Sequence, residues 1–172
     1  MKITLKLVFA IAAIALCSNI SAQNLKLAHI NMEELIISMP EYETAMEKLQ
    51  VIKKELEEEI DNLQVEYRKK LDDYQKNEAN LTDIVKQSRA ADLQNLMQRI
   101  QTFAESAEQQ LEQENNKLMM PIVEKANKAL ENVAKDHGVT YVISANPQIL
   151  LFKAVGTLDL LPAVKEHLGI KK

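Results

Sequence analysis

Three histidines are the only imidazole side chains in the sequence, and imidazole is the group most often used for metal binding or proton transfer. His29, His137 and His167 are far apart in the chain and fall on separate expected elements, which favours structural or surface roles over a joint metal site. No Gly-rich phosphate loop and no G-x-S-x-G nucleophile motif occurs. The sequence therefore predicts a protein that is not an enzyme and that uses no cofactor or metal.

The single cysteine, Cys17, lies in an N-terminal segment with the features of a secretory signal. Two lysines precede an apolar run at 7–16, which is too short to span a bilayer, and small residues follow it. We place cleavage after Ala22, so residues 1–22 form a signal peptide and the mature chain carries no thiol. A lipid anchor on Cys17 is disfavoured, because the bulky Leu16 precedes it.

The charge balance restricts the partners. The sequence has 21 Lys and Arg against 25 Asp and Glu, a net charge of −4. Removing the two lysines of the signal leaves 19 basic and 25 acidic side chains, a net charge of −6. Because an acidic protein repels phosphate backbones, nucleic acid is not an expected partner.

Long helices are expected between residues 41 and 120, where there is no Gly and no Pro. Apolar residues recur there every three or four positions, which is helical spacing. The first stripe is Leu49, Ile52, Leu56, Ile60, Leu63, Tyr67, Leu71 and Tyr74. The second stripe is Leu93, Leu96, Ile100, Phe103, Ala107, Leu111, Leu118, Ile122, Ala126, Ala129 and Val133. The charged residues between these positions are expected on solvated faces.

A turn at 77–82 would fold the two stripes onto each other as an antiparallel coiled-coil hairpin. Asn is tolerant of turn conformations, and Thr82 is a candidate N-cap for the second helix. With the turn centred at Asn80, facing residues have numbers that sum to about 160, which pairs Leu63 with Leu96. The same sum places Pro40 beside Pro121 at the base of the hairpin. At 1.5 Å per residue the first arm is roughly 50 Å long.

Both chain ends are expected to form one small α/β body. A strand is expected over 25–32, followed by a helical turn at 33–37. After Gly138, the runs 139–143 and 149–152 predict a β-hairpin or meander. The segment 159–168 predicts a short helix capped by Asp159. So few short strands cannot make a self-sufficient core, which favours oligomerisation through the body.

The resulting fold class is α+β, mostly α, with a long antiparallel coiled-coil helical hairpin on a small β-rich trimerisation body. The expected division has three parts: the signal peptide 1–22, the body 23–40 and 121–172, and the arm 41–120 with its tip near 77–82.

The arrangement resembles the Skp/OmpH family over the whole mature chain. The matching pieces are LAHINMEELIISMPEYETAMEKL, the long charged hairpin, and VAKDHGVTYVISANPQILLFKAVGTLDLLPAVKEHL. The resemblance implies a periplasmic homotrimer whose three arms enclose a cavity for unfolded outer-membrane β-barrel proteins, held without ATP or metal. It thus implies a holding chaperone. The alternative is a structural or adaptor coiled-coil protein of the cell envelope without client-holding activity.

One departure from that family is charge. The family members used for comparison are basic, with a positive surface suited to lipopolysaccharide, whereas the mature chain here is acidic. The acidic charge argues against a lipopolysaccharide contact.

Four apolar residues beside the main stripes are candidates for contact with a client: Val51, Val65, Met97 and Met120. Met suits such a role, because its flexible thioether adapts to varied partners. The competing interpretation is that these residues pack on the flanks of the hairpin or between arms, as apolar side chains usually do.

Overall fold

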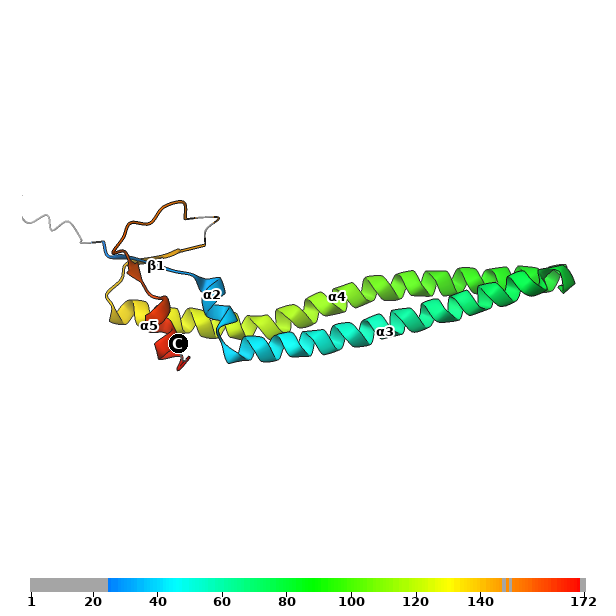
Figure 1. The fold of residues 1–172 in the computed structure, drawn as a ribbon, viewed down its shortest axis with the longest axis horizontal. Coiled ribbons are helices and arrows are strands. Elements are labelled where there is room, and N and C mark those ends of the chain that lie inside the picture. The colour runs from blue at the N-terminus through cyan, green and yellow to red at the C-terminus, as the bar shows by residue number, and fades with distance from the viewer. Residues whose placement is uncertain (1–24, 147, 149, 171–172) are drawn as a thin grey trace, which may run out of the picture.

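A computed structural model describes residues 25–146, 148 and 150–170. The predicted signal peptide, its cleavage site and Cys17 lie outside these residues. The described chain is a long two-helix arm projecting from a small body that contains both chain ends (Figure 1). The predicted fold class is confirmed: the chain is mostly α-helical with one small sheet.

The arm consists of α3 (Pro40–Asn77) and α4 (Asp83–Asp136), joined by the short 3-10 helix η2 (Glu78–Asn80). Pro40 occupies the first turn of α3, where its missing N–H leaves no hydrogen bond unmade. Thr82 is the N-cap residue of α4 as predicted, but its side chain makes no capping hydrogen bond. The turn therefore lies within the predicted range, and the two helices run antiparallel along the arm (Figure 1).

The two apolar stripes line the seam between the helices. Every member of both stripes is buried or partly buried, and Leu63, Leu96 and Ala107 are the most buried residues in the arm beyond its base. A single seam leaves most stripe residues only partly covered, as expected for two helices without a third layer.

The predicted pairing of Pro40 with Pro121 at the base is wrong. Pro121 lies alongside Thr44 and Ala45 instead, and Glu41 pairs with Lys125, so the numbers of this pair sum to 166. Farther along the arm, Glu66 interacts electrostatically with Arg99, and the numbers of this pair sum to 165, so the sum exceeds 160 there as well.

Cysteines placed at Leu63 and Leu96 should cross-link within one chain, because both side chains are buried in the same seam. The mature chain is expected to contain no other cysteine. A disulfide or a short bismaleimide cross-link within one chain should therefore shift its electrophoretic mobility without producing a band of twice the mass. A single continuous rod would separate the two positions by about 50 Å. The matched control places the second cysteine at Leu118 instead of Leu96, which should not react. Cross-links formed only between chains would contradict the hairpin.

The body contains a three-stranded parallel sheet of order β2-β1-β3. The strands are β1 (Leu27–Ile30), β2 (Tyr141–Ser144) and β3 (Leu158–Asp159). β1 lies in the middle and pairs Leu27 with Tyr141 on one side and His29 with Asp159 on the other. The strand predicted over 25–32 and the one predicted over 139–143 are thus present with shifted ends.

The predicted hairpin between 139–143 and 149–152 is wrong. β2 pairs with β1 in parallel, and the described residues of 149–152 are in no strand. The strand that completes the sheet is β3, which ends at Asp159, the first residue of the predicted last helix. Whether an apolar run becomes a strand depends on whether a partner strand is available to it. Here both edges of β1 are already paired, one with β2 and the other with β3.

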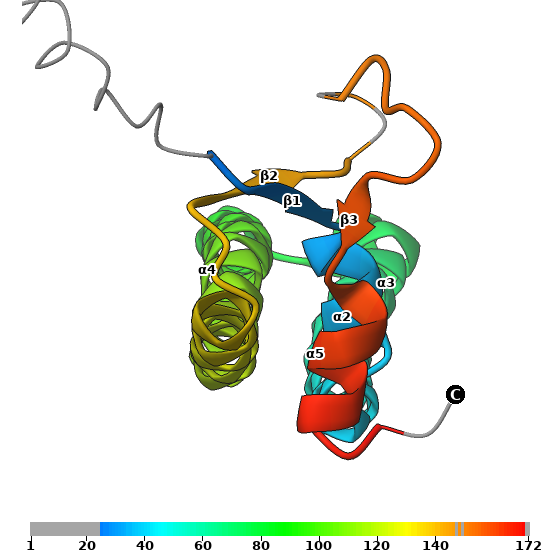
Figure 2. The same cartoon turned by 90° about the vertical axis from the view of Figure 1, so that its left-hand side faces the viewer.

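The core of the body lies between one face of the sheet and the helices. Ala28 and Ile30 of the sheet pack with Leu35 of α2 (Met32–Ile37), the end of α4, and Val164 of α5 (Leu161–His167). α2, α4 and α5 lie on the same side of the sheet, and the other side carries no helix (Figure 2). Asp159 does cap α5 in part, because its Oδ1 accepts a hydrogen bond from the Leu161 N–H at 2.9 Å.

A glycine follows the C-cap residue of α4 and that of α5. Gly138 has φ +61° and Gly169 has φ +70°, backbone conformations that side chains with a Cβ rarely adopt. In the described part of the chain, no helix combines the length and the apolar character needed to cross a membrane.

Candidate functional site

The four candidate contact residues are all more than half exposed. Val51 and Val65 are 57% and 56% exposed on α3, and Met97 and Met120 are 54% and 61% exposed on α4. Val51 and Val65 are fourteen positions apart, which places them on the same side of α3. The residues are spread along the arm and do not form one patch, so any contact they make is shallow and distributed.

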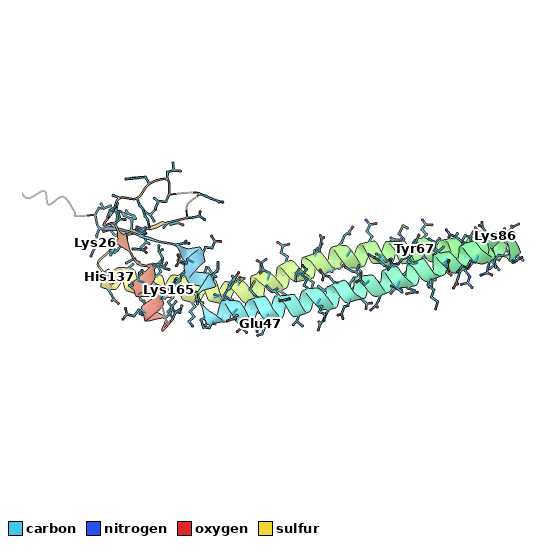
Figure 3. The ribbon with its side chains drawn as sticks, in the orientation of Figure 1. Lys26, Glu47, Tyr67, Lys86, His137 and Lys165 are labelled. Atoms are coloured by element: carbon cyan, nitrogen blue, oxygen red, sulfur yellow. The ribbon has the colours of Figure 1, made fainter. Side chains whose placement is uncertain are left out.

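Most ion pairs of the arm join two residues of the same helix. Lys53 lies 3.7 Å from Glu57, and Lys70 lies 2.7 Å from Glu66, both at i,i+4 spacing. The hydrogen bond from Lys70 lowers the pKa of Glu66 below its usual value. Because these pairs are exposed, they contribute little to stability. Side chains project from both helices along the arm (Figure 3).

At the base of the arm, one ion pair connects the two helices. Lys125 of α4 donates a hydrogen bond to Glu41 of α3, and this contact lowers the pKa of the Glu41 carboxyl below its usual value. The pair fixes the start of α3 against α4 where the arm enters the body.

A second surface was not recognised as a site from the sequence. We call it the outer face: the strand side chains that point away from the helices, together with the exposed apolar loop after β2. Its residues are Leu27, Tyr141, Ile143, Leu151, Phe152 and Val155. Leu151 is 93% exposed and Phe152 is 80% exposed, although aromatic and aliphatic side chains of this size are normally covered.

The sequence contained the signal for this surface in another form. The apolar composition of the run 149–152 predicts a strand, whereas its described residues belong to a loop in which Leu151 and Phe152 are exposed. In Figure 2 the loop after β2 arches on the side of the sheet opposite the helices. Contiguous exposed apolar residues of this kind mark an interaction surface.

The histidines do not come together in a metal site. His29 is buried in the sheet, and His137 and His167 are exposed at the ends of α4 and α5. In the described ranges, no group of three or more His, Cys, Asp or Glu side chains is placed to hold a metal ion.

Comparison with known proteins adds family membership to this geometry. The sequence profile described as "Outer membrane protein (OmpH-like)" matches residues 26–168. The fold is similar to the crystal structure of a protein assigned as an OmpH-like outer membrane chaperone from Caulobacter crescentus, with a TM-score of 0.72 and 13% identity over 83% of this chain and 82% of that one. No curated protein matches the chain. Because the profile covers almost all of the described residues, the resemblance drawn from the sequence is confirmed, and the chain belongs to the OmpH-like outer membrane protein family.

Proposed function

We propose that this protein is a chaperone of the periplasm that holds unfolded outer-membrane proteins without ATP. The single observation that carries the proposal is the arm: two long helices with one apolar seam and partly exposed apolar side chains project far from a small body. Membership of the OmpH-like family supports it. The predicted signal peptide supports export to the periplasm.

Holding by this surface rests on many weak contacts. An unfolded β-barrel chain exposes alternating apolar residues and unpaired strand edges that aggregate. Shallow contacts spread along an arm hold such a chain without fixing its structure, and several arms acting together raise the avidity. We propose that three chains assemble through the outer face, so that their arms surround a common cavity. In this proposal the chain has two functional parts, the arm 41–120 and the body 23–40 and 121–172.

The proposal is tested by diluting a urea-denatured outer-membrane β-barrel protein into buffer with and without the mature chain. Light scattering should fall when the chain is present, and adding ATP should make no difference. Bovine serum albumin at equal mass is the control for non-specific effects. Scattering that is unchanged by the mature chain would favour the adaptor coiled-coil interpretation.

Replacing Val51, Val65, Met97 and Met120 together by Ser should weaken aggregation suppression several-fold and leave thermal stability nearly unchanged. All four side chains are more than half exposed, so their truncation removes little buried apolar area. The measurement is the chaperone concentration that halves the scattering, beside the melting curve by circular dichroism.

The matched control replaces four exposed polar residues of the same helices, Gln50, Gln64, Gln98 and Asn116, by Ser. This variant should protect the client as well as the parent does. If both variants protect equally well, the four apolar residues are not client contacts and serve only to pack the arm.

A further inference from the structure

His29 is the one buried polar or charged residue among those the structure describes, with 6% of its surface exposed. It lies on the middle strand β1, and its register with Ile143 and Asp159 places it on the outer face of the sheet. Its ring Nδ1 is buried and has no hydrogen-bond partner. A buried polar atom without a partner destabilises the fold, so the position calls for an explanation.

The other ring nitrogen is committed to the loop before β3. His29 Nε2 lies 3.0 Å from Thr157 Oγ1, and the same hydroxyl donates its hydrogen to the Ala154 carbonyl at 3.1 Å. Because a hydroxyl has one hydrogen, Thr157 accepts from the ring, and Nε2 carries a proton. In the neutral ring Nδ1 is then a bare acceptor.

Nδ1 faces another acceptor. Asp159 Oδ1 lies 3.9 Å away, and that oxygen already accepts the N–H of Leu161. With the neutral ring, no hydrogen lies between these two atoms. A second proton on the ring would give it a positive charge, with Nδ1 within ion-pair distance of this carboxylate, and the two opposite charges would attract each other.

We propose that protonation of His29 at mildly acidic pH strengthens the attachment of residues 154–159 to β1 and thereby stabilises the body. The charged ring would hold the loop through Thr157 and β3 through Asp159 at the same time. The loop carries Leu151, Phe152 and Val155, so the same contacts also hold the apolar part of the outer face in place. This inference does not depend on the proposed chaperone activity.

Few other titratable groups face this position. Tyr141 is on the neighbouring strand β2, on the same face. Lys153 belongs to the loop, and Lys26, which precedes β1, donates its ammonium to the His137 carbonyl. The helices that pack on the sheet lie on its opposite side. Asp159 is therefore the carboxylate that the protonated ring would meet.

The test measures urea unfolding of the mature chain between pH 8 and pH 5 at one protein concentration, for the parent and for His29→Gln. Glutamine keeps an N–H donor for Thr157 but does not titrate. The stabilisation requires the protonated ring, so it should be present at pH 5 and lost as the pH rises to 8. We expect the unfolding equilibrium constant of the parent, relative to that of His29→Gln, to be about tenfold lower at pH 5 than at pH 8.

Asp159→Asn is the second variant, because the amide oxygen still accepts from Leu161 while the charge is removed. It should remove the extra pH dependence as His29→Gln does, whereas His167→Gln, at an exposed position, should keep it. Nitrogen-15 spectra of the histidines add a direct reading: at pH 8 the His29 ring should be protonated on Nε2 alone. A proton on Nδ1 at pH 8, or a pH dependence that is identical in the parent and His29→Gln, would overturn the proposal.

Discussion

A variant in which both helices of the arm are shortened should keep its body and its assembly but no longer protect an aggregating client. The change deletes residues 50–71 from α3 and 89–110 from α4, which are matched segments of 22 residues on either side of the native turn. It removes Val51, Val65 and Met97 and about 33 Å of arm. Because the proposed binding surface is the length of the arm, light scattering of the diluted client should return to the level seen without chaperone.

The deletion is designed to leave the seam in phase. Twenty-two residues are two eleven-residue repeats, so Tyr74 takes the place of Ile52 and Leu118 takes the place of Leu96 in their stripes. The buried body core, the turn and the Glu41–Lys125 ion pair are untouched. Circular dichroism and sedimentation report whether the body is intact. A shortened protein that protects clients as well as the parent would show that the arms are not the binding element.

Charges on the outer face should dissociate the assembly into monomers. The variant combines Ile143→Asp and Phe152→Asp, which places two carboxylates where we propose that copies of the chain meet. Each charge left unpaired in an apolar interface costs on the order of 3 kcal/mol or more. The two carboxylates together should therefore raise the dissociation constant at least a thousandfold. Sedimentation equilibrium over a dilution series measures it.

The matched control is Ile84→Asp, an exposed apolar residue at the tip of the arm, where 81% of the side chain is accessible. This variant should assemble as the parent does. The parent itself should sediment as a trimer at micromolar concentration. A stable, folded parent monomer under those conditions would overturn the assembly proposal.

The arm was predictable from the sequence because its signals are local and repeated. A run of eighty residues without Gly or Pro, with apolar residues at helical spacing, leaves few alternatives to a long helical hairpin. Pro40 and Gly138 marked the ends of helices for the same reason, since each imposes its own backbone geometry.

The sheet was only partly predictable because its pairing is not local. Both β2 and β3 pair with β1, which is more than a hundred residues away in the chain, and no local pattern encodes that choice. The run 149–152 has the composition of a strand, but those of its residues that the structure describes are not part of the sheet, and β3 is only two residues long. The hydrogen bond between His29 and Thr157 could not be predicted from the sequence either, because it depends on this pairing.

The parallel sheet made from both chain ends has a consequence for the order of folding. β1 is synthesised early, but its partners β2 and β3 are synthesised last, so the sheet forms only after the whole chain has been made. Until then the residues between β1 and β2 form a long open loop, whose closure is entropically costly and slow. The helical arm can zip from its turn and bring the two ends together before they pair. The arm would then bring the two ends of the described chain together, and the outer face would be complete only when the last residues of the sheet have been synthesised.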